Sequence, residues 1–178
     1  MGRKTRAVTS REFKIMLHPE RFSGSQEDAF AAANQFVNDL KDDVRNQIPS
    51  GDDEKIVKGS FDSLDEDKHV TVQFLDTKER ELRNANLVFR QRRHVDGGDL
   101  ELTLKFRHPD RFLSSGTEVG GNKTKFEEDV KTNKASLFVS LHSLSGKVKD
   151  VDENTEFATL KDIREFYPPI KDTLGDTY

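Results

Sequence analysis

Alternation of apolar and polar residues predicts β-strands along much of the chain. Successive side chains of a strand point to opposite faces of a sheet, so an alternating segment has a core face and a polar face. The pattern is clearest at residues 100–107, where Leu100, Leu102, Leu104 and Phe106 share one face. Charged and threonine residues share the other face. This segment therefore predicts a strand with one side in the core.

The same alternation predicts further strands and leaves one segment open. The further strands are expected at residues 10–17, 54–61, 68–76, 87–94 and 123–131. Residues 136–144 fit either a strand or a short helix, because their apolar positions match neither period well.

Two helices are expected, one long and one short. Residues 25–48 carry apolar side chains at steps of three and four, and Ser25 with Asp28 has the spacing of a capping box. The apolar stripe is Phe30, Ala33, Val37, Leu40, Val44 and Ile48. A second helix is expected near residues 159–166, where a Pro-Pro pair follows and ends it. Residues 114–122 contain three glycines and predict a loop.

Composition narrows the class of protein. A chain of 178 residues fits a single domain over residues 1–178 that can bury a core without disulfides. Cysteine is absent, which excludes disulfide frameworks, thiolate metal sites and cysteine nucleophiles, and fits a reducing compartment. No run approaches the ~18 apolar residues of a membrane span, and the first residues lack a signal peptide. We therefore expect a cytoplasmic protein with no membrane partner.

Charged side chains gather on the polar faces of the predicted strands. The cations are Lys14, Arg90, Arg92 and Lys105, and the carboxylates are Glu12, Glu127 and Asp129. If these faces converge inside a curved sheet, like charges about 4 Å apart repel by about 4 kcal/mol at an effective dielectric near 20. A multiply charged anion would relieve this repulsion.

A phosphate chain fits the cations, because arginine offers a planar fork to phosphate oxygens and lysine offers a compact point charge. The carboxylates then require a hard cation, for which Mg²⁺ or Mn²⁺ is the candidate. The net charge of −4 and the lack of an aromatic platform argue against nucleic acid as a partner. The simpler alternative is a sheet whose charged face is merely solvated.

Several short motifs, in a consistent order, resemble one known family. Their sequences are SREFK at residues 10–14, FLDT at 74–77, ELR at 81–83, LVFRQR at 87–92, LTLK at 102–105 and KFEED at 125–129. They are similar to the motifs of the CYTH group of triphosphate tunnel metalloenzymes, which includes tripolyphosphatases, thiamine triphosphatases and class IV adenylyl cyclases. The resemblance covers roughly residues 9–132.

The resemblance implies an α+β fold, in which an antiparallel β-barrel forms a triphosphate tunnel with flanking helices. It implies that inward cations grip the phosphates of a triphosphate-containing small molecule: Lys14, Arg83, Arg90, Arg92, Lys105 and Lys125. It places divalent metal on Glu12, Glu127 and Asp129, and the catalytic chemistry on Glu12, Lys14 and Glu127. In hydrolytic members a metal-positioned water attacks phosphorus while cations stabilise the leaving phosphate.

Two features depart from the family pattern. Ser10 stands where the family has the first acid of its N-terminal Glu-x-Glu-x-Lys strand. The chain also ends at Tyr178, before the family's C-terminal charged strands. The barrel is therefore expected to be open on one side, to be completed by a second copy in a homodimer, or to belong to a shortened form of a longer protein.

Three functions remain open from the sequence. The first is metal-dependent hydrolysis of an inorganic or organic triphosphate. The second is a module that binds polyphosphate or nucleotide without turnover, which the serine at position 10 and the short C-terminus favour. The third is an interaction domain whose charged strand faces are solvated.

Overall fold

The structure is a computed structural model that describes residues 6–14, 17–47, 70–94, 97–132 and 138–174. The chain divides into two compact units. One comprises residues 16–67, and the other comprises residues 1–15 together with 68–178. The predicted strand at residues 54–61 lies outside the described residues.

The unit of residues 16–67 contains a short 3-10 helix, η1 (Pro19–Phe22), and the long helix α1 (Gln26–Gln47). The predicted capping box is confirmed, since the Asp28 amide donates to Ser25 Oγ at 3.1 Å and the Ser25 amide donates to Asp28 Oδ2 at 3.0 Å. Helix α1 buries none of its residues fully, although its apolar stripe is partly covered. No helix in the described part of the chain has the length and apolarity needed to cross a membrane.

The other unit is built on one six-stranded sheet in the order β1-β5-β6-β4-β3-β2. The strands are β1 (Ser10–Lys14), β2 (Val70–Leu75), β3 (Leu87–His94), β4 (Leu100–His108), β5 (Lys123–Thr132) and β6 (Phe138–Val151). The helices are α2 (Glu81–Asn84), α3 (Arg111–Gly116), α4 (Leu160–Phe166) and α5 (Ile170–Leu174). The predicted α+β class is confirmed.

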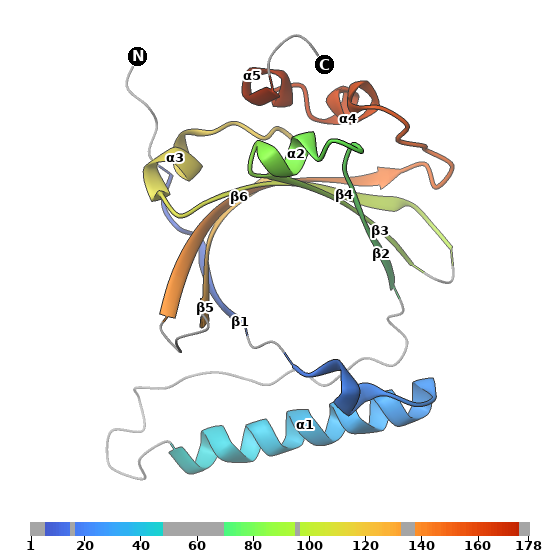
Figure 1. Cartoon of the computed structure of the whole chain (residues 1–178), viewed down its shortest axis with the longest axis vertical. Coiled ribbons are helices and arrows are strands. Elements are labelled where there is room, and N and C mark those ends of the chain that lie inside the picture. The colour runs from blue at the N-terminus through green and yellow to red at the C-terminus, as the bar shows by residue number, and fades with distance from the viewer. Residues whose placement is uncertain (1–5, 15–16, 48–69, 95–96, 133–137, 175–178) are drawn as a thin grey trace. The chain divides into compact units, whose positions relative to one another are not determined.

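The sheet is strongly curved, and the four short helices lie over its convex side (Figure 1). The core fills the space between this side and the helices. Its largest fully buried side chains include Phe89, Leu102 and Leu104 from the strands and Tyr167 and Ile170 from the helical segment. The predicted apolar face of residues 100–107 therefore forms the centre of the core, and the polar alternation of the same strands faces the concave side.

The expected antiparallel barrel is only partly matched. Strands β2 to β6 pair in antiparallel fashion, but β1 pairs with β5 in parallel, so the sheet is mixed. The six described strands form an open sheet with β1 and β2 at its edges. Closure of a barrel is thus not observed among the described residues.

Three segments depart from their local sequence pattern. The described part of the segment left open, residues 138–144, belongs to β6, which extends to Val151 and pairs with both β4 and β5. The predicted loop at residues 114–122 begins later, because Asp110 caps helix α3 by accepting from the amides of Phe112 and Leu113. On β2, Val70, Val72 and Phe74 face the polar side of the sheet, and Phe74 is 68% exposed opposite Arg90.

Candidate functional site

The concave side of the sheet carries most of the charged residues singled out from the sequence, and we call it the polar face. The side chains that alternate with the core residues of β3, β4 and β5 all point to it. Its charged members are Glu12, Lys14, Arg90, Arg92, Glu101, Lys105, Arg107, Lys123, Lys125, Glu127, Asp129, Lys131 and Lys147. Strand pairing thus brings charges from five strands onto one surface.

The strand register arranges these side chains in cross-strand rows. One row runs across β3, β4, β6 and β5 through Arg90, Thr103, Lys147 and Lys123. The next row runs across β4, β6 and β5 through Lys105, Ser145 and Lys125. We call them the two cation rows, since they contain cations and hydroxyl groups but no carboxylate. Their separation is about 7 Å, because two residues of a strand advance by that distance.

Carboxylates flank the cation rows on both sides. Glu127 lies on one side and is paired with Ser10 of β1 and Ser143 of β6. Asp129 and Glu12 form the row beyond it. Glu101 lies on the opposite side, at a register irregularity of β4 between Leu100 and Leu102. The polar face therefore has a positive centre with acids at its two ends.

Glu127 is the most buried of these acids. Its side chain is 6% exposed, with Lys125 Nζ at 2.5 Å and Lys105 Nζ at 3.2 Å. Ser10 Oγ also donates to it at 3.1 Å. Burial alone raises the pKa of Glu127, but Lys125, Lys105 and a hydrogen bond with Glu12 outweigh burial and lower that pKa to about 2. The carboxylate is therefore charged at neutral pH.

Glu12 and Asp129 converge on one ammonium group. Lys14 Nζ lies 3.0 Å from Glu12 Oε2 and 2.8 Å from Asp129 Oδ1. Arg107 adds a longer contact to Asp129 at 3.7 Å. Burial raises the pKa of Asp129, but the bond from Lys14 and the charges of Lys105 and Arg107 bring the net pKa below its ordinary value. Two carboxylates are thus already aimed at one cation.

Glu101 holds a separate set of three cations. Lys147 Nζ lies 2.8 Å from Glu101 Oε2, while Arg92 and Arg90 approach Oε1 at 3.6 and 3.8 Å. The two arginine distances exceed a hydrogen bond. Burial raises the pKa of Glu101, but Lys147, Arg92 and Arg90 together keep that pKa below its usual range.

The two arginines that β3 places on the polar face, Arg90 and Arg92, have donor capacity that the described protein groups leave unused. Arg90 Nη2 donates to Thr103 Oγ1 at 3.1 Å. The Nε atoms of Arg90 and Arg92 are buried, and neither has a hydrogen-bond partner within the described residues. Burial and the neighbouring Arg92 charge lower the pKa of Arg90, although Glu101 opposes this. The Arg90 and Arg92 side chains are nevertheless 27% and 35% exposed, so the rest of each guanidinium suits a ligand with many acceptor oxygens.

Most of the predicted site residues meet on the polar face: Glu12, Lys14, Arg90, Arg92, Lys105, Lys125, Glu127 and Asp129. Arg83 does not join them, since it lies exposed on helix α2, on the convex side of the sheet. Asp76 accepts from the Leu82 and Arg83 amides and so fixes the start of α2.

Five charged residues of the polar face were not among the predicted site residues: Glu101, Arg107, Lys123, Lys131 and Lys147. Glu101 and Arg107 could have been found, because they alternate with the core residues of the clearest predicted strand. Lys147 carried no such signal, since residues 145–151 were not predicted as part of a strand.

Glu12 and Asp129 of the polar face fit a divalent ion whose other ligands come from phosphate and water. No group of three acidic or histidine side chains in the described residues could hold a metal ion. Glu12 and Asp129 nevertheless both contact Lys14 Nζ, so one positive charge already lies between these two carboxylates. Mg²⁺ is commonly bound by one or two carboxylates together with substrate phosphates and water. The pair therefore fits an ion that arrives with a phosphate ligand.

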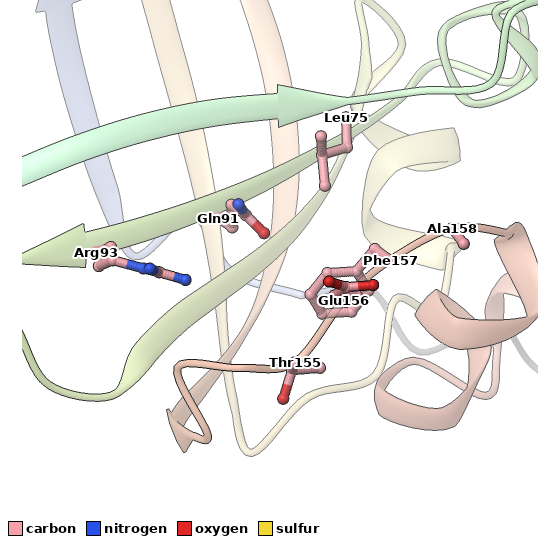
Figure 2. A pocket seen from close by; sticks show the side chains of 7 residues that line it. All are labelled: Leu75, Gln91, Arg93, Thr155, Glu156, Phe157 and Ala158. Carbon is pink, nitrogen blue, oxygen red and sulfur yellow. The ribbon is translucent and has the colours of Figure 1, made fainter.

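A separate hollow of about 360 Å³ lies beside Gln91 and Arg93 of β3, which point away from the polar face. Figure 2 shows Gln91 and Arg93 on one side of it and the segment from Thr155 to Ala158 on the other. The ring of Phe157 packs edge-on against Phe89 with 5.0 Å between centroids. Arg93 is the hollow's one lining cation among the described residues, and it donates to the Glu153 carbonyl. This hollow therefore lacks the grouped cations of the polar face.

Comparison of the chain with protein-family models, with curated proteins and with solved structures found no match in any of the three.

Proposed function

We propose that the polar face binds a triphosphate and hydrolyses it with a divalent metal ion, Mg²⁺ or Mn²⁺. The observation that carries this proposal is the pair of cation rows. Two successive rows with cations, hydroxyl donors and no acid make an extended strip of positive charge. A flexible chain of phosphates matches this strip, because its negative charges are also distributed along its length.

Each part of the face has a distinct task in this proposal. Arg90, Lys105 and Lys125 bind phosphate oxygens, and Thr103 orients the Arg90 guanidinium through its hydroxyl. Arg92 extends the strip beyond Arg90. Lys14 moves away from Glu12 and Asp129 and contacts the leaving phosphate group. Since Thr103 holds Arg90 and Glu127 holds Lys105 and Lys125 before the ligand arrives, little reorganisation opposes the stabilisation of developing charge by these three cations.

The metal ion would be held by Glu12 and Asp129, with Glu127 beside them. When bound, it supplies a Lewis acid that activates water and neutralises phosphate oxygens. Glu127 keeps Lys105 and Lys125 oriented through its two carboxylate oxygens. Ser10, in place of an acid, donates its hydroxyl hydrogen to Glu127 and adds no charge for a second ion.

We also propose that the open sheet is part of a closed tunnel. In the barrel that the family resemblance implies, further strands would join the free edges at β1 and β2 and enclose the polar face. A second copy of the chain could supply these strands, because exposed strand edges favour pairing with another chain. A sizing column run with and without triphosphate tests the dimer.

The experiment is a phosphate-release assay with tripolyphosphate, thiamine triphosphate and ATP, in Mg²⁺, Mn²⁺ or chelator. We expect metal-dependent release that falls by at least about a hundredfold in Lys105→Ala and in Glu127→Ala. Lys161→Ala, on the exposed side of α4, is the matched control and should retain activity. Full activity in both site variants would remove the polar face from the reaction.

A second candidate is a binding module without turnover. Two observations favour it: each of Glu12, Glu127 and Asp129 is already in an ion pair with a lysine, and no three-acid metal group is present among the described residues. Calorimetry with tripolyphosphate in chelator separates the two functions. Tight binding without metal and without product would select the binding module.

A further inference from the structure

Among the described residues of the polar face, Glu101 is the acid on the Arg92 side of the cation rows, and three cations lie within 4 Å of it. Lys147 lies 2.8 Å from it, Arg92 3.6 Å and Arg90 3.8 Å. We call Arg90, Arg92 and Lys147 the three-cation cluster. The Glu101 side chain is 20% exposed, so the cluster is accessible from the polar face.

The carboxylate of Glu101 fills the position that a phosphate group would take in such a cluster. Three cations around two oxygens are the arrangement by which proteins commonly hold a phosphate, with arginines and lysine supplying charged donors. The fit is incomplete, because Glu101 Oε1 is buried without a hydrogen-bond partner among the described residues. Glu101 is also charged at neutral pH, since Lys147 and the arginines lower its pKa.

The register places Glu101 directly beyond the first cation row. Glu101 is paired with Arg92, whereas the neighbouring pair along the two strands is Thr103 with Arg90. A phosphate chain that lies over the cation rows and extends toward Arg92 therefore meets the Glu101 carboxylate. Its next phosphate would have to displace an anion that is already bound to the same three cations.

We propose that Glu101 is a specificity-determining residue that ends the phosphate-binding strip and so limits the chain to about three phosphates. This inference rests on the proposed binding of triphosphate to the polar face. It assigns to the side chain of Glu101 the place of a fourth phosphate. Removing its charge while keeping its shape converts the three-cation cluster into an additional phosphate site.

The test compares tripolyphosphate with tetrapolyphosphate, which differs by one phosphate. Binding is measured by calorimetry on the whole chain for the wild type, Glu101→Gln and Glu101→Asp. We expect the wild type and Glu101→Asp to bind the two anions within about threefold of each other, and Glu101→Gln to bind tetrapolyphosphate about tenfold tighter or more. Glu165→Gln, which removes one charge from the exposed side of α4, should leave the ratio of the two Kd values unchanged.

The ratio of the two Kd values separates this role from simpler ones. An equal gain for both anions in Glu101→Gln would mean that Glu101 acts only through net charge, and would overturn the inference. A loss for both would mean that Glu101 only holds the arginines in place, and would overturn it too. A wild type that binds neither anion would instead refute the proposed function, and the inference with it.

Discussion

The ammonium of Lys105 lies 3.2 Å from the carboxylate of Glu127, although the strands that carry them do not pair with each other. Lys105 is on β4 and Glu127 on β5, and β6 lies between them. The contact is possible because β6 presents only serines at this point of the polar face. Ser145 lies in the row of Lys105, and Ser143 lies in the row of Glu127. A concave sheet with a floor of small side chains lets charges meet across a strand.

The serine floor can be tested by size. Ser145 is 8% exposed, so a leucine at this position would fill the space between Lys105 and Lys125. We expect Ser145→Leu to weaken tripolyphosphate binding about tenfold or more, because the cations are pushed apart, and to cost about 1–3 kcal/mol of unfolding free energy through overpacking. Calorimetry and urea unfolding measure the two effects.

Ser145→Ala is the matched control, since it removes the hydroxyl without adding bulk. We expect it to bind tripolyphosphate within about threefold of the wild type. Wild-type binding by Ser145→Leu would mean that the anion does not lie over β6.

Acid should destabilise the fold through Glu127. Its pKa is lowered from 4.5 to about 2, so between these values the unfolded chain binds a proton that the folded chain does not. The stabilisation is therefore fully present above pH 4.5 and is lost as the pH falls toward 2. Urea unfolding at several pH values should show the free energy of unfolding falling over this window.

In Glu127→Gln the free energy of unfolding should fall less steeply with pH over the same window. The difference in slope should correspond to at most one proton taken up on unfolding. Part of the slope should remain, because the pKa values of Asp129 and Glu101 are lowered as well. An unchanged slope would show that Glu127 is not held by its lysines in solution.

Close backbone packing at Gly146 makes this position intolerant of a side chain. A Cβ added to Gly146 on β6 would lie 1.9 Å from the carbonyl oxygen of Gly120, in the segment that follows α3. We expect Gly146→Ala to lower the unfolding free energy by about 1–3 kcal/mol or more, since a backbone atom must move. Thr124→Ala, at the exposed cross-strand partner, should change it by less than about 1 kcal/mol. Equal effects would argue against the close approach.

Arg6 ties the segment before β1 to the C-terminal end of α3 and to the residues that follow it. Its guanidinium donates to the carbonyl oxygens of Ser115 and Thr117 and pairs with Glu118 at 3.1 Å. We expect Arg6→Ala to cost about 1–2 kcal/mol in urea unfolding, because two carbonyls lose a charged donor. Arg11→Ala, which removes an exposed ion pair with Glu128, should cost less than about 1 kcal/mol. A larger loss in the second variant would contradict this ranking.

The local pattern was sufficient for individual strands and helices. The predicted strand at residues 87–94 coincides with β3, and the long helix begins after its predicted capping residue. Period-two alternation is a property of a strand itself, so Arg90 and Arg92 could be assigned to the polar side without knowing any neighbour. The same reasoning holds for Lys105 on β4 and for Glu127 and Asp129 on β5.

The alternation of apolar and polar residues did not predict which way β2 faces, and it left part of β6 ambiguous. Three apolar residues of β2, Val70, Val72 and Phe74, face the polar side, because they pair with the polar-face residues of β3. In β6, Leu141 lies in the row of Asp129 on the polar face, whereas Leu144 lies in the core, so apolar residues stand on both faces and the alternation is lost.

The sequence alone determined which side chains of each strand share a face, because that follows from the geometry of one extended chain. Only the tertiary structure decided which strands lie next to one another. It placed β6 between β4 and β5, paired β1 in parallel with β5, and thereby brought Lys14 to Asp129 and Lys147 to Glu101. Such contacts depend on packing between segments far apart in the chain, which local periodicity does not encode.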